Sequence, residues 1–157
     1  MENGLTDIST ASLTIRECQY GVVKITPEKM DYSVVETDVQ KWAENNGITD
    51  ENLLDFEQYN NDFYFDSAYR KAYSNVAELK LTDEEKDILA AMWAEFNVNY
   101  FAGTLDEFYP QMLESEGCRI MNEKGLADSW NFAYMLTAAS GGTAENNQIS
   151  WEKSFAE

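Results

Sequence analysis

Seven carboxylates follow one another along residues 42–69 with no lysine or arginine among them. They are Glu44, Asp50, Glu51, Asp55, Glu57, Asp62 and Asp66. Glu51 and Asp55 are four residues apart, so on a helix they would face the same way, about 6 Å apart, and repel each other slightly. Such a spacing is comparable to that of successive phosphates on a nucleic-acid strand. We therefore predict that these seven residues bind a basic partner surface. The alternative is a solvated helix face.

The whole chain shares this acidic character. It has 29 Asp and Glu against 11 Lys and Arg, a formal net charge of −18 on 157 residues. This balance argues against direct binding to nucleic acid, whose phosphates require Lys and Arg, and against anionic membranes. We expect the partner to be a basic protein, with a nuclease or another nucleic-acid-binding protein as the leading class. The sequence leaves the oligomeric state open.

The sequence offers little catalytic chemistry. It contains no histidine, the side chain most used for proton transfer and metal binding near neutral pH. It has no phosphate-binding glycine motif, no Gly-x-Ser-x-Gly and no Cys-x-x-Cys. Acidic pairs four residues apart, Asp62 with Asp66 and Asp83 with Asp87, could bind Mg²⁺, but a chain this acidic produces such pairs by chance. We expect no enzymatic activity, no catalytic residue, no cofactor and no metal.

A dense aromatic cluster overlaps the acidic stretch. Its members are Tyr59, Phe63, Tyr64, Phe65, Tyr69 and Tyr73. One interpretation is a stacking platform for bases, but such platforms lie in basic grooves and no basic residue lies between Lys41 and Arg70. We favour packing in the core and at its rim.

Helices must position these residues, because capping boxes and apolar residues at helical spacing dominate after residue 30. A Ser33–Glu36 capping box predicts a helix that ends before Gly47. Pro110 would break a longer helix, so we expect a helical turn at 105–108 and a new helix from Pro110. The predicted helices cover residues 34–46, 50–59, 63–80, 82–103, 110–116 and 122–139.

The predicted fold is mainly α, a compact bundle of about six helices around a central apolar helix at 122–139. Residues 12–25 are rich in β-branched side chains and predict a small N-terminal β element. We expect a single domain over 1–157, with residues 1–10 as a loose arm and the tail 143–157 docking on the body.

The start of the chain has no basic segment followed by an apolar one, and no apolar run is long enough to span a bilayer. Cys18 and Cys118 are far apart in sequence, and we expect both to be free thiols. These features predict a cytoplasmic protein without a membrane partner.

The functional hypothesis is a non-enzymatic acidic protein that occupies a basic, nucleic-acid-binding surface of its partner. Inhibitors of the anti-defence type made by phages, DNA mimics and immunity proteins against nuclease toxins work by this logic. The second hypothesis is a virion structural or assembly protein, such as a connector, a decoration protein or a tail chaperone, whose β segment pairs with a neighbouring sheet edge. The third is a small enzyme with a carboxylate-bound metal.

Overall fold

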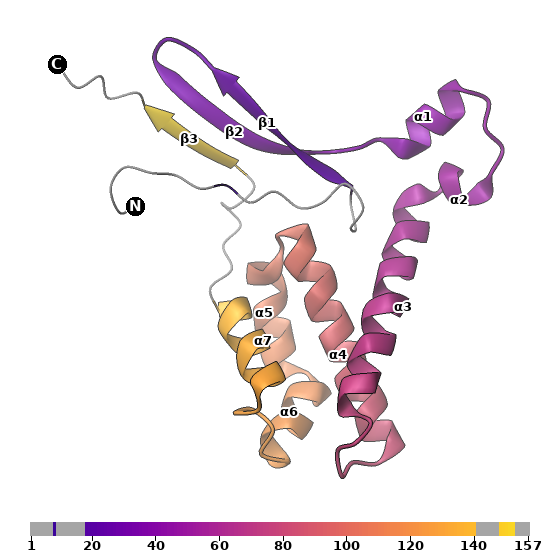
Figure 1. Cartoon of the computed structure of the whole chain (residues 1–157), viewed down its shortest axis with the longest axis vertical. Coiled ribbons are helices and arrows are strands. Elements are labelled where there is room, and N and C mark those ends of the chain that lie inside the picture. The colour runs from indigo at the N-terminus through magenta and orange to yellow at the C-terminus, as the bar shows by residue number, and fades with distance from the viewer. Residues whose placement is uncertain (1–7, 9–17, 141–147, 153–157) are drawn as a thin grey trace.

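The computed structural model describes residue 8, residues 18–140 and residues 148–152. Within this part the protein is mainly helical with a small antiparallel sheet, which confirms the predicted fold class (Figure 1). The expected N-terminal arm lies outside the described residues apart from Ile8, as do residues 12–17 of the predicted β element. The same holds for residues 143–147 and 153–157 of the tail.

The sheet has three strands in the order β1-β2-β3 and stands apart from the helices (Figure 1). The strands are β1 (Gln19–Ile25), β2 (Lys29–Glu36) and β3 (Gln148–Glu152). A tight turn joins β1 to β2, in which the Thr26 N–H donates to the Lys29 carbonyl at 2.9 Å. The C-terminal strand β3 pairs with β2, so the two ends of the described chain meet in one sheet.

Seven helices make up the rest of the described chain. They are α1 (Val39–Asn45), α2 (Glu51–Leu54), α3 (Phe56–Val76), α4 (Asp83–Ala102), α5 (Leu105–Glu114), α6 (Glu116–Glu123) and α7 (Trp130–Ser140). The long helices α3 and α4 run side by side, and α5, α6 and α7 cover another side of α4. Towards its N-terminal end α3 diverges from α4 in the direction of α1 and α2 (Figure 1).

The core lies around α4, which buries Leu89, Met92 and Phe96 completely or nearly so. Opposing helices contribute Met112, Met121 and Met135, all almost inaccessible to solvent. None of the described helices is long and apolar enough to cross a membrane.

The predicted central helix at 122–139 is wrong in its bounds. The structure ends α6 at Glu123 and begins α7 at Trp130. Gly125 adopts a left-handed conformation with φ +67°, which glycine adopts at little cost, and the Leu126 N–H closes the end of α6 by donating to the Met121 carbonyl at 2.8 Å. The apolar residues from Trp130 onwards therefore form the shorter helix α7, and α4 takes the central place.

The predicted start of the first helix is also wrong. Val34 and Val35 belong to β2, where they pair with Gly21 and Tyr20 of β1, and α1 begins only at Val39. β-Branched residues favour a strand. A local capping pattern carries no information about pairing with β1, so it could not predict this strand.

Pro110 lies inside α5 rather than at a helix start, contrary to expectation. Its ring removes one backbone hydrogen bond, but Leu105, Phe108 and Met112 are buried on one face of the continuous helix. Packing of that face compensates for the lost bond.

Candidate functional site

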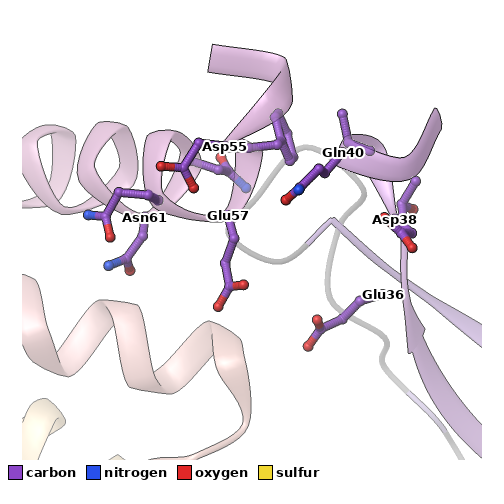
Figure 2. A pocket seen from close by; sticks show the side chains of 11 residues that line it. Glu36, Asp38, Gln40, Asp55, Glu57 and Asn61 are labelled. Carbon is purple, nitrogen blue, oxygen red and sulfur yellow. The ribbon is translucent and has the colours of Figure 1, made fainter. Parts of the chain in front are cut away.

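A cleft of about 610 Å³ lies where the end of β2 and the start of α1 face the first turns of α3 (Figure 2). Its lining comprises Glu36, Thr37, Asp38, Val39, Gln40, Asp55, Phe56, Glu57, Gln58, Asn60 and Asn61. The lining is mostly polar and, among the residues that the structure describes, includes no lysine or arginine. The sheet, α1 and α3 together build this cleft.

Four of the lining residues are carboxylates. Glu36 ends β2, Asp38 precedes α1, and Asp55 and Glu57 flank the start of α3. All four are exposed to solvent. Figure 2 shows Glu36 and Glu57 projecting towards one another from opposite walls. The cleft therefore combines concave shape with concentrated negative charge, an arrangement that attracts cations.

The two acidic residues at helix starts play different local roles. The Asp38 side chain caps α1 by accepting the Lys41 N–H at 2.9 Å. Asp55 occupies the capping position of α3, but its side chain makes no capping hydrogen bond. The Asp55 carboxylate is therefore free of local helix contacts and available to a bound partner.

Hydrogen bonds connect Cys18, which directly precedes β1, with the end of β2 and with α3. The Thr37 hydroxyl donates to the Cys18 carbonyl at 2.8 Å, and the Asn60 side-chain amide donates to the Cys18 sulfur at 3.6 Å. Burial raises the pKa of the Cys18 thiol, against the smaller effect of the Asn60 hydrogen bond. Cys18 also has φ +44°, an unusual value for a residue other than glycine. Both cysteines are free thiols in the structure, as predicted, and Cys18 serves as a structural tie.

Two amides that line the cleft hold predicted partner-binding residues in place. Gln40 donates to the Glu44 carboxylate at 3.1 Å, and Gln58 donates to the Asp62 carboxylate at 2.8 Å. Both pairs are four residues apart on one helix, the spacing at which side chains meet. These bonds extend the ordered acidic surface outwards from the cleft along α1 and α3.

The seven residues predicted to bind a partner are all exposed. The structure brings Asp55 and Glu57 into the cleft, while Glu44 and Asp62 lie one turn from lining residues. The remaining three, Asp50, Glu51 and Asp66, do not line it: Asp50 caps α2, Glu51 is in α2, and Asp66 lies further along α3.

Sequence reasoning missed Glu36 and Asp38 as part of the cleft. It placed Glu36 inside a helix, whereas the residue ends a strand. The one available signal was Asp38 directly before Val39, because an aspartate before an apolar helical segment indicates a helix start.

Among the described residues, no three histidine, cysteine, aspartate or glutamate side chains are grouped closely enough to hold a metal ion. The four carboxylates of the cleft are thus spread along its walls. Their arrangement suits several separate positive charges better than one ion at a single point.

Comparison with known proteins places the helical part of the chain in a family. A comparison with curated proteins gives no match. The family described as the C-terminal domain of cyclic nucleotide phosphodiesterase matches residues 38–140, from the cap of α1 to the end of α7. The match covers more than half of the chain and includes most of the cleft, but it leaves out all three strands. The description of this family refers to one domain of an enzyme. The chain belongs to the family of the C-terminal domain of cyclic nucleotide phosphodiesterase.

Proposed function

We propose that this protein is a non-enzymatic acidic binding protein that occupies a basic, nucleic-acid-binding surface of another protein. Inhibition of the anti-defence or immunity type, with the acidic surface acting as a DNA mimic, is the form of this function that we favour. The observation that carries the proposal is the cleft, in which the described lining residues include four exposed carboxylates and no lysine or arginine. The acidic stretch continues this surface along α1 and α3.

Electrostatics favours a cationic occupant of the cleft. Two unit charges 4 Å apart in water interact by about 1 kcal/mol, and the interaction grows as a partner excludes water. The carboxylates of the cleft would repel an anionic ligand, whereas they would attract a lysine- or arginine-rich surface. Exposed charges act mainly on the rate of association and its dependence on salt.

The family description supports a second candidate function, the hydrolysis of a cyclic nucleotide. In this chain such a reaction would use a cleft carboxylate, for example Glu57, to activate water. The transition state of phosphodiester hydrolysis carries negative charge and is stabilised by positive groups. The lining supplies no lysine or arginine and the chain has no histidine, so we rank this function below binding.

We also propose that the protein works in the cytoplasm. Two free thiols are typical of a reducing compartment, and both cysteines are free.

Affinity capture followed by competition tests the proposal. The immobilised protein is incubated with cell extract at low salt, and captured proteins are eluted with rising salt and identified. Each is then titrated with a DNA or RNA duplex in the presence of this protein. We expect a basic partner that binds either nucleic acid or this protein, but not both together. Simultaneous binding of both would refute the proposal.

Two parallel measurements separate the other functions. Incubation with 2′,3′- and 3′,5′-cyclic mononucleotides should give no hydrolysis above a buffer control. Hydrolysis that disappears in a Glu57→Gln variant would instead establish the enzymatic function. Sedimentation of the protein alone distinguishes the assembly hypothesis, which requires a ring or ordered polymer.

A further inference from the structure

The first half of α3 presents two aromatic rings to solvent between exposed carboxylates. Tyr59 is 41% exposed and Phe63 is 60% exposed. Asp62 and Asp66 are also exposed, and the four residues have the three- and four-residue spacing of neighbours on one helix face. We call Tyr59, Asp62, Phe63 and Asp66 the α3 stripe.

The rings of the stripe are ordered against one another. The ring centroids of Tyr59 and Phe63 are 6.2 Å apart with an interplanar angle of 28°. Phe56 continues the row, with its centroid 6.4 Å from that of Tyr59. Successive rings along one helix face thus form a preformed apolar surface beside the exposed carboxylates.

Within the described residues, the ring and hydrogen-bond contacts identified between α3 and α4 come from outside the stripe. These contacts use other residues of α3: Tyr64 meets Phe101 edge to face at 5.6 Å, and the Tyr69 hydroxyl donates to Asp87 at 2.7 Å. The helix is therefore held on α4 without the exposed rings, which leaves Phe63 available for an intermolecular contact.

The carboxylates of the stripe keep acceptor capacity. Asp62 accepts one hydrogen bond from Gln58 at 2.8 Å, and a carboxylate can accept about four. Asp66 pairs with Arg70 at 3.8 Å, but these side chains are 66% and 79% exposed. An exposed pair at that distance is weak and easily exchanged for another cation.

We infer that the α3 stripe binds arginine side chains of the partner in preference to lysine. This inference rests on the proposed binding function and narrows it by naming the side chain recognised. The guanidinium group is planar, stacks on aromatic faces and donates two parallel hydrogen bonds to a carboxylate. The stripe offers a ring and a carboxylate side by side. A lysine ammonium can also lie over a ring, but it cannot stack as a flat group or donate two parallel hydrogen bonds to one carboxylate. The charge complementarity and the rings together therefore select arginine.

Two synthetic probes test the inference: an oligo-arginine peptide and an oligo-lysine peptide of equal length, titrated by calorimetry at one ionic strength. We expect wild-type protein to bind the arginine peptide more tightly, by up to about fivefold, because the guanidinium group stacks on a ring and pairs with a carboxylate at once. Because the two peptides carry the same charge, the ratio of their dissociation constants removes the contribution of bulk electrostatics.

Variants locate the source of the preference. Phe63→Leu keeps an apolar side chain but removes the ring, and should bring the two dissociation constants to within about twofold of each other. Tyr20→Leu is the matched control, because Tyr20 is 43% exposed but lies on β1. It should leave the preference unchanged. Asp62→Asn combined with Asp66→Asn should weaken both peptides and the arginine peptide more.

The possible outcomes separate the inference from the function on which it rests. Equal binding of both peptides by wild-type protein would overturn the arginine preference and leave the binding function standing. A preference that survives Phe63→Leu, or that Tyr20→Leu removes equally, would also overturn it. If neither peptide binds at low salt, the proposed function fails as well.

Discussion

The two halves of α3 differ in what they contact. In the first half, residues 56–66, aromatic and acidic side chains face solvent and the cleft, and Phe63 is the most exposed of the aromatics. In the second half, Ala72 and Val76 are buried, and Tyr69 bonds to α4. The first half also contacts α4 through Tyr64 and Phe101, so only its exposed side chains are available for binding. Mutations of those exposed side chains should therefore change binding with little effect on stability.

Charge compensation follows the same division. Beyond α3, Arg119 pairs with Glu116 and Glu123, and Lys124 pairs with Glu85 at 2.6 Å. Over the seven carboxylates of the acidic stretch, the described residues hold one ion pair, the weak one between Asp66 and Arg70. The negative charge around the cleft is therefore almost uncompensated within the described residues, which supports a cationic partner there.

The largest expected effect is on stability, from truncating a core ring. Phe96 is 2% exposed in the core cluster, and Phe96→Ala should lower the free energy of unfolding by about 3–5 kcal/mol. Phe63→Ala, the matched change in the exposed half of α3, should cost less than about 1 kcal/mol. Chemical denaturation measures both. Similar losses for the two variants would show that the stripe belongs to the core.

A smaller loss is expected from overpacking between α4 and α6. A Cβ atom at Gly117 would lie 2.8 Å from the Met92 sulfur and 2.9 Å from the Met92 Cβ. Overpacking typically costs about 1–3 kcal/mol. The better helix propensity of alanine offsets part of this cost, so Gly117→Ala should destabilise the protein by about 1 kcal/mol. Glu114→Ala, at an exposed position of the neighbouring helix α5, is the control and should change little. Unchanged or increased stability of the glycine variant would contradict the tight helix contact.

The pair between Glu85 and Lys124 predicts a pH dependence. Hydrogen bonds from Lys124 and from the Thr82 backbone hold the pKa of Glu85 below its usual range. A carboxyl group whose pKa is lower in the folded state than in the unfolded state stabilises the protein at pH values above the unfolded-state pKa, which is about 4.3 for Glu. This contribution disappears as the pH falls through the folded-state pKa. Glu85→Gln should thus melt below wild type at pH 7, with the gap closing below about pH 4. Glu84→Gln is the control, since Glu84 makes no ion pair within the described residues. A gap that stays constant with pH would exclude the ionic origin.

The smallest expected effect concerns the two thiols. Cys18 is partly exposed beside the cleft, whereas Cys118 is buried in the core. A thiol reagent should modify Cys18 first, though more slowly than a peptide thiol because burial raises its pKa, and Cys118 only upon unfolding. Asn60→Ala removes the hydrogen bond that lowers the Cys18 pKa, and should slow the thiolate-dependent step. Faster modification of Cys118 than of Cys18 would contradict this order.

Local signals predicted the structure where local contacts decide it. The Thr82 capping box is present with both hydrogen bonds, at 3.2 Å and 2.8 Å. The Ser33 box failed because pairing with β1 holds Val34 and Val35 in a strand. Thr104 makes no capping hydrogen bond to α5, and its hydroxyl donates to Asn99 at 2.8 Å instead. A local sequence pattern cannot account for the pairing with β1 that decides the conformation at Ser33.

The same reason explains what could be predicted of the site. Asp55 and Glu57 stand within a visible run of acidic residues, so composition alone selected them. Glu36 joins them only because β2 ends opposite α3, and that approach depends on the sheet and on the tie between Cys18 and Asn60. Concave shape arises from distant segments, and the sequence showed only the charge.

The association rate of the captured partner, measured at several salt concentrations, tests the central claim most directly. The triple variant Glu51→Lys, Asp55→Lys and Asp62→Lys reverses charges around the cleft. The control Glu95→Lys, Glu107→Lys and Glu114→Lys makes the same change in net charge at exposed residues of α4 and α5. We predict at least about tenfold slower association and a flatter salt dependence for the first variant only, because steering depends on nearby charges. Equal slowing by both variants would show that only the total charge matters and that the acidic stretch is not a binding site.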